Sequence, residues 1–207
     1  SEVRSQASEA QLKLLETQLE PHMLFNTLAN LRVLIGTDPA RAQDMLDRMI
    51  AYLRATLTAS RSTQHPLENE FDRLRDYLEL MAVRMGPRLH YTLDLPEALR
   101  QVPVPPLLLQ PLVENAIRHG LEPKLDGGRI DIRARNDGTG QLLLEVIDTG
   151  VGMDTGGAPP SGSGFGLSQV RERVASLPGG GRVDLSAQPG HGATVRIHLP
   201  FVNTPQP

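Results

Sequence analysis

The chain has 207 residues, of which 39% are hydrophobic and 22% charged, a composition that supports a buried core in one large domain or two small ones. A formal net charge of −3 argues against a nucleic-acid-binding face, and the absence of cysteine excludes disulfides, thiolate metal sites and cysteine catalysis. No apolar run approaches the roughly 20 residues that a membrane helix needs, and we interpret the polar start without Met as a piece of a longer protein.

Two long helices joined by a short turn are predicted for the first sixty residues. Apolar residues recur at three-and-four spacing over 12–35 and again over 40–59. Between them, residues 36–39 (Gly-Thr-Asp-Pro) interrupt the pattern, with Asp38 as a helix N-cap and Pro39 in the first turn of the second helix. Because such a hairpin is thin and cannot bury both apolar stripes, we expect it to pair with a second copy as a four-helix bundle.

Strands and helices alternate in the rest of the chain. A third helix is expected over 67–85, closed by Gly86 and Pro87. Further helices are expected at 111–120 and 165–176, and strands at 89–95, 130–134, 142–147, 183–187 and 193–199. Strands mixed with helices on one side predict an α+β sandwich. Residues 149–164, rich in Gly, Pro and Ser, predict a mobile loop.

The first candidate binding segment covers residues 114–119 (Glu-Asn-Ala-Ile-Arg-His), on the helix after Pro111. Residues four apart share a side of a helix, so Asn115 lies beside His119, and Glu114 beside Arg118. An amide oxygen next to a carboxylate suits a hard Mg²⁺ ion, which makes Asn115 and Glu114 candidate ligands. Arg118 and His119 could then contact phosphate oxygens. By itself, the segment favours an ordinary amphipathic helix with a solvated polar face.

Three glycine-containing segments follow. Residues 148–152 (Asp-Thr-Gly-Val-Gly) come directly after an expected strand, where the Asp148 carboxylate can accept a hydrogen bond from an exocyclic amine. Residues 162–167 (Gly-Ser-Gly-Phe-Gly-Leu) open a helix whose free N–H groups suit phosphate. Residues 190–194 (Gly-His-Gly-Ala-Thr) form a turn between strands. Each segment alone is common in turns and loops, and the chain contains no P-loop motif.

Taken together in this order and spacing, the four segments resemble the ATP-binding domain shared by histidine kinases, gyrase, MutL and a heat-shock chaperone family, over about residues 88–200. The resemblance implies a Bergerat-type α/β sandwich, with ATP under a lid formed by residues 153–164. It implies that Asn115 binds Mg²⁺, that Asp148 binds the adenine amine, and that Thr194 supports the adenine contact through water. It also implies that Gly150 and Gly152 contact the base edge, and that Gly164, Gly166 and Leu167 line the phosphate side.

The N-terminal half resembles the LytS/YehU-type sensor histidine kinases. Residues 18–28 (Gln-Leu-Glu-Pro-His-Met-Leu-Phe-Asn-Thr-Leu) are similar to the phosphoacceptor segment of that family, with His22 as the phosphorylated residue. Further similarity lies at Leu67-x-x-Glu70, 77–80, Arg84, 106–117 and 166–174. Pro21 within a helix costs about 3 kcal/mol, and the resulting bend would present the imidazole of His22. By itself, the pair is equally compatible with a surface histidine beside a kink.

The resemblance implies an ATP-dependent protein-histidine kinase. A neutral imidazole nitrogen of His22 would attack the γ-phosphoryl group, while Mg²⁺ offsets charge on the leaving ADP. The phosphohistidine would then donate to an aspartate of a response regulator receiver domain. Glu114 is the candidate to polarise the nucleophile or a water, and Glu20 is an alternative base. Asn26, one turn after His22, could orient the ring or a hydrolytic water. The remaining histidines are expected at surface or strand positions: His65, His90, His191 and His198.

These interpretations divide the chain into four parts. Residues 1–66 are the dimerising phosphoacceptor hairpin, 67–87 a connecting helix, 88–201 the ATP-binding domain, and 202–207 a flexible tail. The expected partners are a second copy and a response regulator, without nucleic acid. Membrane contact is expected only through regions outside this chain, so the chain would be the cytoplasmic portion of an inner-membrane bacterial sensor.

Three other functions remain open at the level of sequence. An ATP-driven conformational switch would hydrolyse ATP without a phosphohistidine, but it would leave residues 18–28 unexplained. A serine kinase of the anti-sigma type shares the ATP-binding fold and lacks the helical hairpin over 12–59. A dimerisation scaffold would bind ATP and transfer nothing.

Overall fold

The computed structural model describes residues 21–59, 63–152 and 164–200. The chain forms two compact units, residues 1–61 and 62–207, which are described in turn. None of the helices described is both long and apolar enough to span a bilayer.

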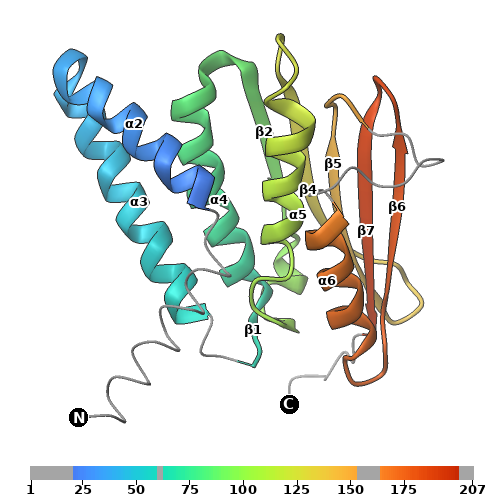
Figure 1. Ribbon diagram of the computed structural model, residues 1–207. Coiled ribbons are helices and arrows are strands. Elements are labelled where there is room, and N and C mark those ends of the chain that lie inside the picture. Colours follow the sequence, from blue (N-terminus) through green and yellow to red (C-terminus); the bar gives the residue numbers. More distant parts are fainter. Residues whose placement is uncertain (1–20, 60–62, 153–163, 201–207) are drawn as a thin grey trace, which may run out of the picture. The chain divides into compact units, whose positions relative to one another are not determined.

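The first unit is a helical hairpin. Helix α2 (Pro21–Thr37) packs along helix α3 (Pro39–Ala59), as Figure 1 shows in blue and cyan. The predicted cap at Asp38 is confirmed, because its Oδ1 accepts a hydrogen bond of 3.1 Å from the backbone N–H of Arg41. The expected extension of the first helix before Pro21 lies outside the described residues, and so does any bend that Pro21 would cause.

The second unit opens with a short strand and a long helix. Strand β1 (His65–Pro66) pairs antiparallel with strand β3 (Pro103–Val104), a small sheet that the sequence analysis did not anticipate. Helix α4 (Leu67–Met85) follows with the predicted bounds. It ends at Gly86, whose φ of 59° is costly for other residues and whose N–H donates to the Ala82 carbonyl. Short 3₁₀ turns, η1 (Gly86–Arg88) and η2 (Glu97–Leu99), flank the next strand.

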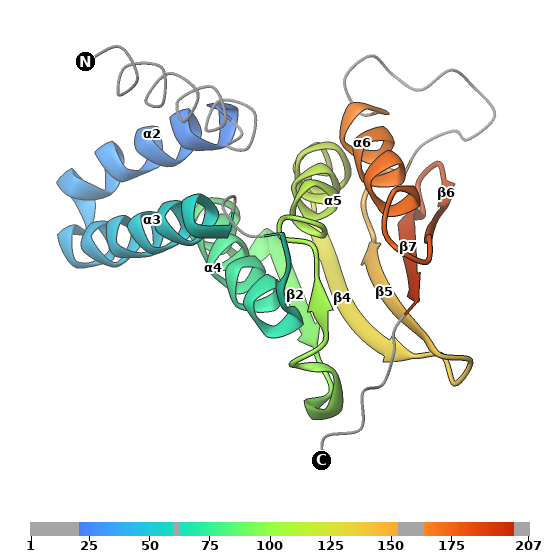
Figure 2. The ribbon, with the colours of Figure 1, turned by 90° about the horizontal axis from the view of Figure 1, so that it is seen from below.

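A five-stranded mixed sheet forms the body of the second unit. The strands are β2 (Leu89–Asp94), β4 (Gly128–Asn136), β5 (Gln141–Asp148), β6 (Arg182–Gln188) and β7 (Gly192–Pro200). Their order is β2-β4-β5-β7-β6, with β2 parallel to β4 and all other pairs antiparallel. Helices α4, α5 (Gln110–Asn115) and α6 (Gly164–Ala175) lie on one face of this sheet (Figure 2). The predicted α+β architecture is therefore confirmed.

Alternating side chains explain why only one face of the sheet is covered. On β4 and β5, Ile132 and Leu144 are fully buried toward the helices. The intervening positions of β5 are partly exposed and include both polar and apolar residues. On this face, which has no helices, Arg196 on β7 donates to Glu145 on β5 over 2.9 Å. Apolar side chains at every second position thus form the core, and the row between them remains partly exposed.

The helix predicted over 111–120 has two parts. Its first part is the α-helix α5, and its second is a π-helix, η3 (Ala116–Leu121), closed by a hydrogen bond from the Glu122 N–H to the Ile117 carbonyl. Hydrophobic periodicity over ten residues does not distinguish the two types of helix. Short π-helical turns occur frequently at functional sites, and this one forms one wall of the cavity described below.

Candidate functional site

A cavity of about 300 Å³ opens between α5 and η3, the end of β5, the start of β7 and the start of α6. This volume lies at the lower end of the roughly 300–1,000 Å³ of small-molecule pockets. Its lining is mainly apolar, with a few polar groups. The lining residues are Leu112, Asn115, Ala116, His119, Gly120, Val146, Asp148, Val151, Gly152, Leu167, Leu185, Ala193 and Val195. The cavity therefore suits a largely apolar group that presents few hydrogen-bonding atoms.

Asp148 is the buried acid of this cavity. It is the last residue of β5 and is only 7% exposed. Its Oδ1 accepts a hydrogen bond of 2.8 Å from the backbone N–H of Gly150. Burial raises the pKa of this carboxyl above its ordinary value, although the N–H groups of Gly150 and Ala193 and the charge of Lys124 act in the opposite direction. A carboxylate that is short of solvent is a strong acceptor for a ligand's N–H donor.

Two glycines allow the π-helix to approach this acid. A Cβ on Gly120 would lie 2.9 Å from the Oδ1 of Asp148, and a Cβ on Gly150 would lie 2.3 Å from the backbone carbon of Gly120. Because neither glycine has a side chain, the two backbones approach closely enough for the Val151 N–H to donate to the Gly120 carbonyl over 2.9 Å. The sequence analysis assigned Gly150 to the base edge. The structure adds that Gly150 joins the strand end to η3, and that Gly120 is part of the same contact.

The other predicted glycines occupy similarly close positions. Gly152 lines the cavity with a φ of 66°, and a Cβ there would lie 2.0 Å from the Gln188 carbonyl oxygen. Gly166, in the first turn of α6, faces Asn115, whose Nδ2 would lie 2.7 Å from an added Cβ. Gly164 begins α6. Leu167 lines the cavity. The start of α6 and the end of α5 therefore meet beside Asn115.

The segment at 114–119 divides between two environments. Asn115 and His119 lie on the cavity wall, whereas Glu114 and Arg118 are not among the lining residues. Glu114 instead accepts a hydrogen bond of 2.8 Å from the Nε2 of Gln110. Among the described residues, no group of three or more His, Asp or Glu side chains is placed to hold a metal ion. A metal in this cavity would therefore depend on the Asn115 amide and on oxygens of its ligand.

Thr194 lies on the opposite face of the sheet from the cavity. Its neighbours Ala193 and Val195 line the cavity, and Ala193 pairs with Asp148 across the β5–β7 ladder. Because side chains alternate along a strand, Thr194 belongs with its register partner Ile147 on the other face. The position that contacts the Asp148 side of the cavity is thus Ala193. Alternation along the strand predicted at 193–199 puts Ala193 and Thr194 on opposite faces, but which of the two faces the cavity follows only from the register with β5.

This placement gives a testable difference between adjacent residues. Thr194→Val is expected to leave affinity for an adenine nucleotide within about twofold, since the change is isosteric and faces away from the cavity. Ala193→Val adds two carbons beside Asp148, and overpacking of about 1–3 kcal/mol predicts a loss of about tenfold or more. Titration calorimetry on both variants measures this. Weaker binding by Thr194→Val, with wild-type affinity in Ala193→Val, would instead support Thr194 as the residue that contacts adenine through water.

Several predicted residues cannot be placed at the cavity. Glu20 and residues 153–163 of the expected lid lie outside the described residues. The backbone of His22 lies in the first turn of α2, but its side chain is outside what the structure describes. Asn26 lies one turn further along α2 and is partly exposed. These residues of the first unit remain assigned from sequence alone.

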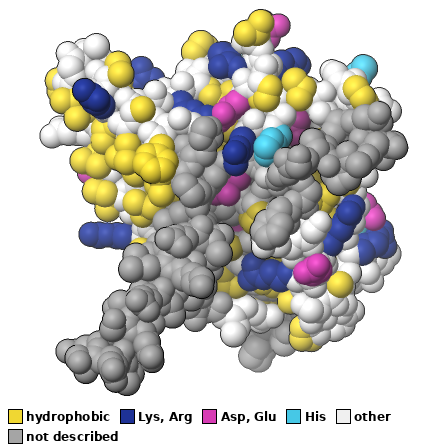
Figure 3. Space-filling view, viewed as in Figure 1, with side chains coloured by type: hydrophobic (Ala, Val, Ile, Leu, Met, Phe, Trp, Pro, Cys, Tyr) yellow, Lys and Arg dark blue, Asp and Glu magenta, His cyan; other side chains and the backbone are white. Residues whose placement is uncertain are grey.

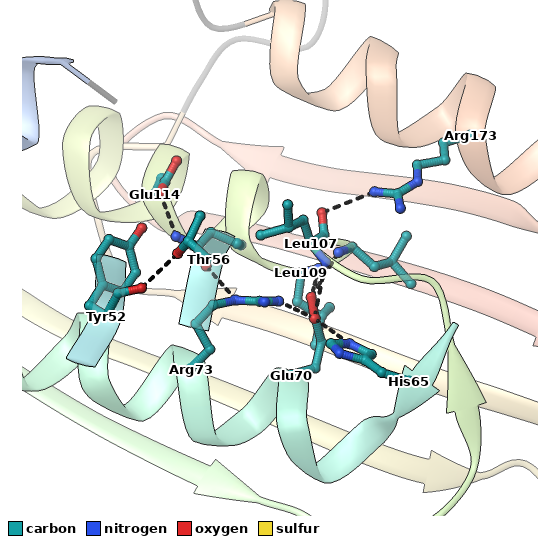
Figure 4. A network of polar contacts seen from close by, with 11 residues as sticks. Tyr52, Thr56, His65, Glu70, Arg73, Leu107, Leu109, Glu114 and Arg173 are labelled. Carbon is teal, nitrogen blue, oxygen red and sulfur yellow. Dashed lines mark hydrogen bonds and ion pairs between the residues drawn. The ribbon is translucent and has the colours of Figure 1, made fainter. Parts of the chain in front are cut away.

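A buried polar network beside α5 was missed by the sequence analysis (Figure 4). Glu70 on α4 is 0% exposed and Arg73 is 2% exposed, and the two form an ion pair. The Nε2 of His65 lies 2.9 Å from the Oε2 of Glu70. Burial by itself would raise the pKa of Glu70, but the hydrogen bond with His65, the charge of Arg73 and the Leu108 N–H together hold it below its ordinary value. His65, expected at a surface or strand position, is a strand residue with this further partner.

Comparison with known proteins agrees with the geometry. Residues 10–89 match the family model described as "Histidine kinase", and residues 106–203 match that described as "Histidine kinase-, DNA gyrase B-, and HSP90-like ATPase". The histidine kinase domain of the Erythrobacter litoralis EL346 blue-light activated histidine kinase has a similar fold. The TM-score is 0.56 at 16% identity, over 96% of this chain and 94% of that one.

Curated relatives extend the similarity over most of the chain. Sensor histidine kinase BtsS of Escherichia coli (strain K12) is 30% identical over 200 residues, which are 96% of this chain and 35% of that protein. Sensor protein LytS of Bacillus subtilis (strain 168) is 30% identical over 203 residues, 93% of this chain and 34% of that protein. The chain therefore spans about a third of the length of these relatives.

The fold and the cavity define a nucleotide-binding domain of the type shared by histidine kinases, gyrase B and HSP90, preceded by a histidine kinase helical segment. Within that class, the chain belongs to the sensor histidine kinase family that includes LytS.

Proposed function

We propose that this chain is a kinase core that binds Mg-ATP in the cavity and phosphorylates its own His22. The phosphoryl group then passes to an aspartate of a response regulator. The observation that carries the proposal is the buried Asp148 carboxylate at the end of β5, in a mainly apolar cavity with Asn115 on its wall. A histidine kinase helical segment precedes this cavity in the same chain.

The described residues suit the two ends of ATP differently. Leu112, Val146 and Val195 offer apolar surface to a purine ring, and Asp148 offers an acceptor to its exocyclic amine. Asn115, at the end of α5, and His119, on η3, are polar groups on the same wall of the cavity, and we assign them to the phosphates. Mg²⁺ bound to Asn115 and phosphate oxygens would offset negative charge during transfer, and it would keep several waters, as this ion usually does.

We assign three roles to residues near the phosphoacceptor. His22 supplies the nitrogen that forms the new N–P bond as the bond to ADP breaks. Asn26, one helical turn later, orients the imidazole. Glu114 is the proposed base, with Glu20 as the alternative. The hydrogen bond from Gln110 to Glu114 supports a fixed position for that carboxylate.

The hairpin within residues 1–66 is the proposed dimerisation part. Phe25, Val33 and Ile35 of α2 are 72%, 64% and 62% exposed, and hydrophobic side chains gather over this hairpin in Figure 3. Exposed apolar side chains on a helix favour burial against a second copy, as in a four-helix bundle. Residues 67–87 and 88–201 are then the proposed connecting helix and ATP-binding domain. We place this core on the cytoplasmic side of a bacterial inner-membrane sensor.

Incubation with Mg²⁺ and γ-labelled ATP tests the proposal. The wild-type chain is expected to acquire an acid-labile, alkali-stable label, as a phosphohistidine would. His22→Gln is expected to reduce the label to background while leaving ATP binding intact, since His22 lies outside the unit that contains the cavity. Asn115→Ala is expected to lose both label and Mg-ATP affinity.

His90→Gln is the matched control, because His90 is an exposed histidine on β2 and is expected to leave the label unchanged. A label that survives in His22→Gln would assign the phosphoacceptor elsewhere. A wild-type chain that binds ATP but acquires no label would favour the conformational switch or the scaffold.

A further inference from the structure

One carboxylate holds the segment that leads into α5. The Oε1 of Glu70 accepts hydrogen bonds from the N–H groups of Leu108 and Leu109 over 2.7 and 3.3 Å, and its Oε2 accepts one from Leu107 over 3.1 Å. Leu109 is the N-cap residue of α5 and has no side-chain cap of its own. Glu70 therefore holds the backbone just before the helix and the N-cap residue itself from 39 residues away, and it fixes where α5 begins.

The same segment is strained and tied from a second side. Leu107 has a φ of 59° and is the one non-glycine residue with positive φ in the described part of the chain. Such a backbone persists only where its surroundings determine it. The Leu107 carbonyl accepts a hydrogen bond of 3.4 Å from the Nη1 of Arg173 on α6. Figure 4 shows this contact and the Glu70 contacts converging on the 107–109 backbone.

A second set of hydrogen bonds reaches further along α5. Arg73 donates from Nε to the Oε1 of Gln110 over 2.9 Å, and Gln110 donates from Nε2 to Glu114 over 2.8 Å. Asn115 follows directly and lies on the cavity wall. Glu70 and Arg73 therefore both act on the N-terminal end of this short helix, and the hydrogen bond from Gln110 to Glu114 continues the network within α5. A backbone contact before the helix and a side-chain contact at its first residue set where α5 begins and how it is rotated about its axis.

We propose that Glu70 is a positioning residue for the nucleotide site, which sets the register of α5 so that Asn115 faces the bound phosphates. The proposal rests on the proposed function of the cavity. Asp148 does not depend on this network in the same way, because it is held on β5 between β4 and β7. Glu70 touches neither the cavity nor its ligand and acts through α5.

The test is a double-mutant cycle between Glu70→Gln and Asn115→Ala, with Mg-ATP binding measured by calorimetry on the 207-residue chain. A glutamine at residue 70 would direct its NH₂ group, a hydrogen-bond donor, toward the backbone N–H groups of residues 107–109, which are also donors. Glu70→Gln is expected to weaken binding about tenfold in the wild-type background, as loss of a charge-assisted hydrogen bond does. In the Asn115→Ala background it is expected to change binding by less than about twofold, since coupled residues are not additive. Equal losses in the two backgrounds would overturn the proposal.

Glu68→Gln is the matched control, because Glu68 lies in the same first turn of α4 but accepts its hydrogen bond from Gln101. It is expected to leave Mg-ATP affinity unchanged. If Glu70→Gln fails to fold, His65→Leu removes a single partner of Glu70 and is expected to give a smaller, equally non-additive loss.

Hydrogen exchange of the peptide containing residues 107–115 separates this proposal from the proposed function. These amides are expected to exchange faster than in the wild type in Glu70→Gln, or in His65→Leu if that variant replaces it. In Glu68→Gln they are expected to exchange at the wild-type rate. Both results are expected with and without nucleotide. Unchanged protection in the Glu70 or His65 variant would overturn the positioning role. If the variants show this exchange pattern but the wild-type chain does not bind Mg-ATP, the proposed function is overturned and Glu70 has a structural role only.

Discussion

Asp148→Asn is expected to weaken ATP binding by about 10- to 100-fold, because a hydrogen bond to a charged acceptor contributes about 1.5–3 kcal/mol. The Oδ1 of Asp148 accepts from the Gly150 N–H, so an asparagine that kept this bond would turn its NH₂ group toward the cavity. That group is a donor, and it would face the exocyclic amine of adenine, which is also a donor.

The same substitution is expected to raise the free energy of unfolding of the nucleotide-free protein. Burial raises the pKa of Asp148 above its ordinary value, so the folded state disfavours the ionised carboxyl. The stability associated with this group is therefore fully present below the pKa of the unfolded chain and is lost as pH rises through the folded pKa. Asparagine carries no charge and removes this loss.

Two measurements on Asp148→Asn check these expectations. Calorimetric titration gives the loss of ATP affinity, and denaturant unfolding from mildly acidic to neutral pH gives the stability of the nucleotide-free chain. Asp184→Asn is the control, since Asp184 is a half-exposed carboxylate bound to Arg182 on β6 and does not line the cavity. An Asp148→Asn variant with wild-type affinity, or with lower stability at neutral pH, would contradict the role assigned to this acid.

Gly150→Ala is expected to lower the free energy of unfolding of the second unit by about 3 kcal/mol or more, at the upper end of overpacking effects. The added Cβ would lie 2.3, 2.4 and 2.5 Å from three backbone atoms of Gly120, and backbone cannot move aside as a flexible side chain can. The hydrogen bond from the Val151 N–H to the Gly120 carbonyl would break as well. Because Gly120 also adjoins the Asp148 carboxylate, ATP affinity is expected to fall with stability.

Gly36→Ala provides the comparison for this steric effect. Neither Gly36 nor Gly150 has a positive φ, but a Cβ on Gly36 would meet nothing within 4 Å. Alanine is favoured over glycine within a helix by about 1 kcal/mol, so Gly36→Ala is expected to be neutral or stabilising. Chemical denaturation followed by circular dichroism measures both variants. Equal stability of Gly150→Ala and wild type would show that η3 does not approach β5 as closely as described.

The helices of the hairpin and α4 were predictable because their signals are local. Apolar periodicity, the Asp38 cap and the glycine after Met85 each act within one or two turns of chain, and α4 has the predicted bounds. The five strands of the large sheet were predicted within about two residues at each end, since their alternation matches a sheet covered on one face, whereas the short strands β1 and β3 were not predicted. The π-helix was not predicted, because its apolar spacing resembles that of an α-helix over so few residues.

By itself, the sequence determined the fold class, the order of the elements and the chemical types at the site: an acid after a strand, an asparagine on a helix, and glycines where backbone must approach closely. Only the tertiary structure decided which of these groups share a cavity. It placed Ala193 on the cavity face and Thr194 on the other, brought Gly120 against Asp148, and joined Glu70 to the start of α5. These contacts depend on strand register and on pairs of residues far apart in the chain, and local propensity carries no information about either.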